Sequence, residues 1–169
     1  GLGQMTLAAS GRPFLLGYQM ADRSFAASIA AFADKTKAQM QAVLSESIQD
    51  VMDIAQTPVA NGGRMPVDDG HLINSVVTEL NGSQIGQASD AADTSGASSS
   101  ANIALLVTQM QPGDIASIGW TAAHAMRQHE GFVGEDSLGR TFNQEGKHWV
   151  DGAAAQWEQI VARNVERLK

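Results

Sequence analysis

The chain has 169 residues and a formal net charge of −7, and 43% of its residues are hydrophobic whereas only 5% are aromatic. This length suits one domain with a modest core, and the negative charge argues against tight non-specific binding of nucleic acid. The absence of cysteine excludes disulfides, thiolate catalysis and cysteine-ligated metal sites. No run approaches the roughly 20 apolar residues that cross a bilayer, and no targeting signal is apparent. We therefore expect a soluble protein that is made in the cytoplasm and has no membrane partner.

Residues 1–21 are rich in glycine and predict no regular element, so we expect a flexible N-terminal arm. This arm either frays or becomes ordered on a neighbouring subunit. Residues 22–169 are expected to form a single α+β domain. Its apolar residues recur every 3.6 positions from Asp22 to Gln56, which predicts a long amphipathic helix. Asp22 or Ser24 is its expected N-cap, and Pro58 is expected to stop it because proline lacks an amide proton.

A turn-rich segment follows the predicted helix. Pro66 favours an extended Met65, and Asp68 or Asp69 could cap a helical turn over residues 70–76. Residues 81–102 contain one large apolar side chain, Ile85, and are therefore predicted to form a flexible insertion, either solvated or ordered against a subunit.

The remaining elements predict a small antiparallel sheet and a second helix. Residues 103–110 and 115–120 are compatible with strands, and a type II turn at 111–114 would join them into a β-hairpin. A helical turn is expected over 122–128, and Gly131, Gly134 and Gly139 indicate a loop. An amphipathic helix is then predicted over 147–169. This order of helix, sheet and helix indicates an α+β fold.

The three tryptophans are large anchors in a chain that is poor in aromatic residues: Trp120, Trp149 and Trp157. Trp149 and Trp157 are eight positions apart, so both would lie on one face of the C-terminal helix. We expect them to pack in the core, and the alternative is that they are anchors of a protein interface.

The spacing of histidines and carboxylates in the sequence argues against a catalytic site. Four histidines are candidate metal ligands: His71, His124, His129 and His148. His124 and His129 are five residues apart, a spacing that does not place two ligands on one helical face, and His129-Glu130 lacks the second histidine of a zinc-protease motif. The acidic pairs Asp68/Asp69 and Glu135/Asp136 are adjacent in sequence, and neighbouring carboxylates rarely reach the same reacting atom. We expect no enzymatic activity, cofactor or metal site. The alternative from this class is a small metal-dependent hydrolase that uses His124, His129 and Glu130.

Two motifs resemble a known family. The first is Pro66-Val67-Asp68-Asp69-Gly70-His71-Leu72 with Ser75, and the second is the segment from His124 through His129 and Glu130 to Gly131. In this order, between a long helix and a final amphipathic helix, they resemble the tail-completion or tail-component proteins of long-tailed bacteriophages, the group that includes the lambda-type minor tail protein Z. The chain departs from that pattern at Asp69, His71 and His124, where threonine, a basic residue and tyrosine are usual.

This resemblance implies a structural virion protein of the phage neck or tail, assembled in the host cytoplasm. It implies a homo-oligomeric ring, expected to be a hexamer, that performs tail completion by joining the head-proximal end of the tail to the head-tail connector. Its partners would be the connector, the tail-tube or tail-terminator proteins, and DNA that passes through the lumen without specific binding. A tail terminator or a head-tail connector component is the alternative within the same setting.

Overall fold

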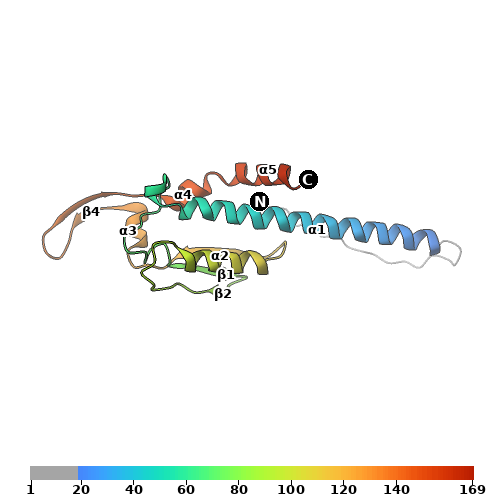
Figure 1. The fold of residues 1–169 in the computed structure, drawn as a ribbon, viewed down its shortest axis with the longest axis horizontal. Coiled ribbons are helices and arrows are strands. Elements are labelled where there is room, and N and C mark those ends of the chain that lie inside the picture. Colours follow the sequence, from blue (N-terminus) through green and yellow to red (C-terminus); the bar gives the residue numbers. More distant parts are fainter. Residues whose placement is uncertain (1–18) are drawn as a thin grey trace. The chain divides into compact units, whose positions relative to one another are not determined.

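The structure, a computed structural model, describes the backbone of residues 19–169 and the side chains of residues 27–169 (Figure 1). The chain divides into two units, residues 1–37 and 38–169, and α1 (Gln19–Gln56) contributes residues to both. Helices and small antiparallel sheets make up the described part, which confirms the predicted α+β class. The predicted arm lies outside the described residues, except that residues 19–21 belong to α1. None of the described helices is long and apolar enough to span a membrane.

In the unit of residues 1–37, the described residues all belong to α1. Asp22 and Ser24 lie within the described part of α1, so the predicted N-caps were wrong. Ile29 and Phe32 lie three positions apart, which places them on one helical face, and both are exposed.

Within the unit of residues 38–169, α1 ends at Gln56, two residues before Pro58, as predicted. A single 3-10 turn, η1 (Val59–Asn61), follows, and the chain folds back so that Met65 pairs with Pro58 in an isolated bridge. The Met65 side chain is fully buried. Helix α1 is thereby connected directly to the first of the two motifs (residues 66–75). We refer to it and to the second motif (residues 124–131) as the first and second signature segments.

A three-stranded antiparallel sheet follows, with β1 (Val76–Leu80) between β2 (Ser83–Gly86) and β3 (Ala116–Trp120). Val76 pairs with Trp120 and Leu80 with Ala116, so these side chains share one face of the sheet. That face packs in the hydrophobic core, whereas Glu79 and Ser117 on the other face are exposed. The expected helical turn over 70–76 is a turn that ends at Asn74, because Val76 already belongs to β1.

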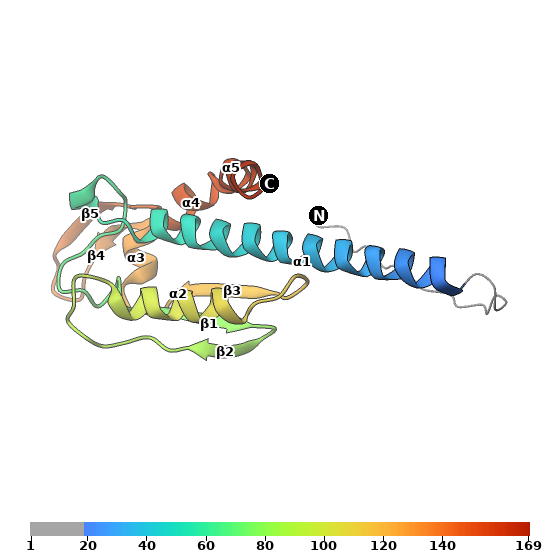
Figure 2. The ribbon, with the colours of Figure 1, turned by 45° about the vertical axis from the view of Figure 1, so that its right-hand side comes forward.

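The predicted hairpin of residues 103–110 and 115–120 was wrong in its first strand. Residues 103–109 belong to α2 (Ala97–Gln109), whose buried positions recur at helical spacing: Ser99, Ile103, Leu106 and, at the C-cap, Met110. The predicted turn is present, since the Asp114 amide donates to the Gln111 carbonyl at 3.0 Å and Gly113 has φ +99°. It joins α2 to β3 instead of joining two strands. Figure 2 shows α2 lying along the sheet.

The expected unstructured insertion over 81–102 was also wrong in part, because it contains β2 and the first half of α2. Asn81 and Gly82 form a two-residue hairpin turn between β1 and β2, with φ of +52° and +80°. Asn-Gly favours this turn because both residues tolerate positive φ.

The C-terminal part contains α3 (Ala125–Glu130), the hairpin of β4 (Gly131–Glu135) and β5 (Thr141–Glu145), α4 (Trp149–Ala154) and α5 (Trp157–Arg167). The segment marked by glycines is therefore a hairpin and not a loop. The helix predicted over 147–169 is two helices with a turn at residues 155–156. As a result Trp149 is 2% exposed and packs in the core as expected, whereas Trp157 is 37% exposed, contrary to the prediction.

Two buried clusters form the core of this unit. The first joins the end of α1 to the signature turn, α3 and α4: Ala55, Met65, Leu72, Ile73, Ala125, Trp149 and Ala153. The second joins α1 to β1 and α2: Ile48, Met52, Val76, Ile103 and Met110. Trp120 packs against both clusters and thereby connects them.

Candidate functional site

The two signature segments lie together in space. A pocket is lined by Pro66, Val67, Asp68, Asp69, Gly70 and Leu72 from the first segment and by His124 and Gln128 from the second. It encloses about 120 Å³, whereas pockets for drug-sized ligands hold roughly 300–1,000 Å³. The site therefore suits an inserted side chain better than a small-molecule substrate.

Gly70 has a backbone reason to be glycine. Its φ is +94°, and a Cβ built at this position would collide with the backbone of Asp93. The adjacent Asp69 accepts a hydrogen bond from the His71 amide at 3.1 Å, which is the capping role expected of this aspartate pair. The first signature is thus shaped by close packing against residues that follow β2.

Asn74 holds this packing together, although it was not among the predicted site residues. Its fully buried side-chain amide donates to the Gly70 carbonyl at 3.2 Å and to the Asp93 carbonyl, and its Oδ1 accepts from the Ser98 amide at 3.3 Å. One side chain thereby joins the signature turn, the segment after β2 and the start of α2.

Ser75, the last residue of the first signature, joins it to the end of β3. Its hydroxyl donates to the Leu72 carbonyl at 2.8 Å. Its own carbonyl accepts two bonds of 3.0 Å from Thr121, one from the amide and one from the hydroxyl. Thr121 lies just before the second signature segment in the chain, so these bonds hold the start of that segment near the first.

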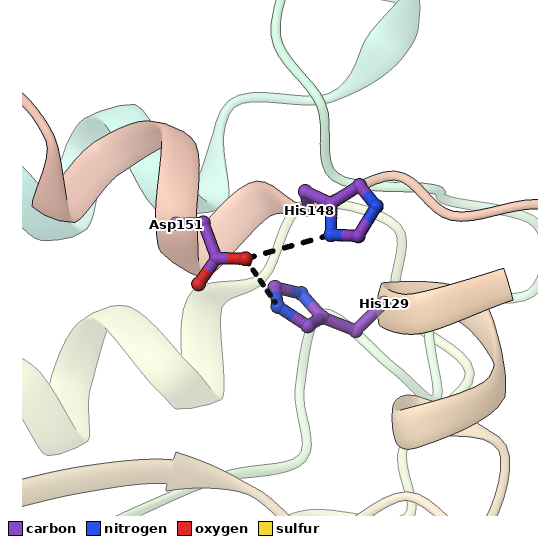
Figure 3. Close-up of side chains that lie close together, drawn as sticks. All are labelled: His129, His148 and Asp151. Atoms are coloured by element: carbon purple, nitrogen blue, oxygen red, sulfur yellow. Dashed lines mark ion pairs between the residues drawn. The ribbon is translucent and has the colours of Figure 1, made fainter.

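The second signature contributes a cluster of side chains that Figure 3 shows: His129 from the end of α3, and His148 and Asp151 from the start of α4. Asp151 Oδ2 lies 3.4 Å from His129 Nε2 and 3.5 Å from His148 Nδ1. The two imidazole rings meet edge to face with centroids 5.4 Å apart. The spacing of His124 and His129 did not reveal this cluster, because its other members lie on a separate segment.

The base of the β4–β5 hairpin fixes these residues. The His148 amide donates to the His129 carbonyl at 3.1 Å, and the Lys147 amide donates to the Gln128 carbonyl at 2.9 Å. Gly131 permits this approach, since its φ is +87° and a Cβ there would lie 2.5 Å from the Gln144 carbonyl oxygen. The two strands leaving α3 and entering α4 are therefore in tight backbone contact.

The other candidate residues lie outside the cluster. His124 lines the pocket, and His71 lies 3.5 Å from Asp69. Glu130 lies 3.7 Å from His129 Nε2. Asp136 caps the β4–β5 turn: the Arg140 amide donates to its carboxylate, and this bond is the main reason why the pKa of Asp136 is lowered.

Comparison with known proteins adds no relative. No family model matches the chain, and no curated protein or solved structure does so either.

Proposed function

We propose that this protein is a structural component of the neck or tail of a long-tailed bacteriophage, where it forms a ring that joins the tail to the head connector. The observation that carries the proposal is the meeting of the two signature segments. They are distant in sequence, yet they line one pocket and are linked through Ser75 and Thr121. A family signature made of two segments is expected to describe one folded unit, and these segments form one.

Exposed apolar side chains in the unit of residues 38–169 support an assembly role. Val133 and Leu138, on the β4–β5 hairpin, are 79% and 74% exposed, and Ile115 and Met126 are also exposed. We propose that a neighbouring subunit covers these side chains, because their burial would be favourable. A closed ring needs two different faces that meet head to tail, and this hairpin is our candidate for one of them.

A second contact element is the long amphipathic helix itself. Ile29 and Phe32 form an exposed apolar pair on α1 in the unit of residues 1–37. We propose that this pair packs against a neighbouring subunit, because burying such side chains contributes roughly 1.5–3 kcal/mol each.

The charge of the chain suits a conduit for DNA. With a net charge of −7 the protein does not attract phosphate, so DNA could pass the lumen without being held. The proposed location is the virion, after assembly in the host cytoplasm.

The test is assembly of the tag-free chain. Its mass would be measured by light scattering alone and after mixing with the connector, the tail-tube protein and the tail terminator, and the products would be imaged by electron microscopy. We expect rings, alone or on the connector. A chain that stays monomeric and binds none of the three contradicts the proposal, whereas binding only to the tail tube would favour the tail-terminator alternative.

A matched pair of variants sharpens this test. Val133→Ser combined with Leu138→Ser should lower ring formation at least about tenfold, because one lost buried side chain contributes more than 1.4 kcal/mol. Val59→Ser, at an exposed valine of η1, serves as the control and should assemble like the unmodified chain.

A further inference from the structure

We propose that His129, His148 and Asp151 bind one divalent transition-metal ion of the zinc class at the base of the β4–β5 hairpin. The inference stands on the geometry of these three side chains and does not depend on the neck role. It also departs from the expectation, drawn from histidine spacing alone, that the chain has no metal site.

The distances between the donor atoms suit a common ion. Zinc lies about 2.0–2.1 Å from histidine nitrogen and about 2.0–2.2 Å from carboxylate oxygen, so two ligands of a tetrahedron are about 3.3–3.5 Å apart. Asp151 Oδ2 lies 3.4 Å from His129 Nε2 and 3.5 Å from His148 Nδ1. The three donor atoms all lie within 4.8 Å of one another, so small rotations of the two rings would complete the site.

The donor types select the class of metal. Two imidazoles and one carboxylate are preferred by zinc, and also by iron, nickel and copper, whereas magnesium and calcium prefer oxygen ligands alone. Water would occupy the fourth position, as at zinc sites with three protein ligands. Glu130 Oε1 lies 3.7 Å from His129 Nε2 but is not one of the three donors that come together.

The backbone holds these residues in place before any ion binds. His148 has φ +47° and ψ +45°, a left-handed conformation that is uncommon for residues other than glycine and costs of order 1 kcal/mol. Its amide bond to the His129 carbonyl, at 3.1 Å, keeps the two histidines together. Such a conformation at the residue that brings its ring beside His129 is the kind of local strain that clusters at binding sites.

The surroundings of His129 indicate that the metal ion would bind with moderate affinity. Its ring packs edge to face on Trp149, with centroids 4.8 Å apart. Among the side chains that the structure describes, its second nitrogen, Nδ1, is buried without a hydrogen-bond partner. Metal-binding histidines usually donate this second N–H to an acceptor, and losing that bond typically weakens binding 10–100-fold. We therefore expect binding to be measurable and reversible by a chelator.

A bound ion would act as a cross-link. It would join the end of α3 to the start of α4, on either side of the hairpin that carries Val133 and Leu138. Binding to the folded state alone raises the stability of that state. The hairpin would then be held more firmly in metal than in chelator.

The experiment uses the full chain without a histidine tag, first stripped with chelator and dialysed. Zinc would be titrated by calorimetry, with cobalt as a spectroscopic probe because a cobalt ion bound by protein ligands gains visible absorption. We expect one ion per chain and a thermal midpoint that rises with zinc. His148→Asn, which tolerates the left-handed conformation, and Asp151→Asn should each weaken binding at least about tenfold.

Two control variants and one folding check make the outcome decisive. His71→Gln and His124→Gln remove histidines outside the cluster and should bind zinc like the unmodified chain. Circular dichroism in chelator should show that the Asp151→Asn chain, altered at an exposed side chain, is folded. The proposal is overturned if the unmodified chain binds no more tightly than Asp151→Asn, or if the His71 and His124 variants weaken binding equally.

Discussion

Trp120 at the end of β3 and Trp149 at the start of α4 meet edge to face, with ring centroids 5.9 Å apart and planes inclined by 79°. This geometry lets the positive edge of one ring face the negative face of the other. Because Trp120 also packs against both core clusters, the pair connects the sheet to the C-terminal helices. Two of the three tryptophans thus form one contact between the sheet and the C-terminal helices.

We predict that Trp149→Ala lowers the free energy of unfolding by about 3–5 kcal/mol, because it leaves a large cavity at a side chain that is 2% exposed. Trp157→Ala is the matched comparison, and its cost should be clearly smaller because that side chain is already partly in water. Urea titration of both variants measures the difference. Equal losses would contradict the assignment of Trp149 as the anchor.

Gly70→Ala should destabilise the protein more than Gly113→Ala. Both glycines have a φ near +95°, at +94° and +99°, so both substitutions incur the same backbone strain. Only at position 70 would the new Cβ meet another backbone, that of Asp93, whereas nothing lies within 4 Å at position 113. Gly113→Ala is expected to cost about 1–2 kcal/mol, in keeping with the left-handed penalty. If thermal and urea unfolding show the same loss for both variants, the close packing at Gly70 is refuted.

Asn164→Ala should cost about 1–3 kcal/mol, because it removes a buried donor from polar partners that stay in place. The Asn164 side chain is 1% exposed and donates to Asp50 at 2.9 Å and to Ser47 at 3.2 Å, so it fastens α5 to α1. Gln159→Ala changes an exposed amide of the same helix and should be nearly neutral. Urea unfolding, followed by circular dichroism, measures the free energy of unfolding of both variants. Equal losses would contradict the role assigned to Asn164.

Stability should fall as the solution is acidified below about pH 4. The pKa values of three aspartates are lowered in the folded state: that of Asp93 mainly by the Ser95 hydroxyl, that of Asp114 mainly by the Asn81 amide, and that of Asp136 mainly by the Arg140 backbone amide. The unfolded chain, with aspartate pKa values near about 3.9, then binds more protons than the folded chain, so stability rises with pH in this range.

The stabilisation from these carboxylates is complete above the unfolded pKa and is lost as the pH drops through the lowered folded values. Asp114→Asn combined with Asp136→Asn should flatten the pH dependence of the urea midpoint between about pH 4 and pH 2. A double variant with an unchanged slope would show that these groups are not responsible.

Local signals in the sequence predicted some elements correctly. Pro58 stops α1 because proline cannot donate the next hydrogen bond, and Pro112-Gly113 forms the expected turn. The apolar run 103–110 was misread because a short run fits either a strand or a buried helix. The buried residues Ile103, Leu106 and Met110 are at helical spacing, but the apolar Leu105 and Val107 between them hide this spacing in the sequence.

The candidate site was harder to predict than the fold. Most residues that line the pocket had been singled out because each motif is contiguous in sequence, whereas Gln128 had not. Asn74 was missed because the role of a buried asparagine depends on its hydrogen-bond partners. These are Asp93 and Ser98, which are distant from Asn74 in sequence. The His129 cluster was missed for the same reason, since His148 and Asp151 approach His129 only when the β4–β5 hairpin closes.

The contact between Asn164 and Asp50 also imposes an order of events on the growing chain. Asp50 leaves the ribosome 114 residues before the side chain that pairs with it. During that interval the polar patch of Ser47 and Asp50 on α1 must stay hydrated, because burying it early would leave it without its donor. Docking of α5 on α1 through this contact consequently follows the synthesis of Asn164.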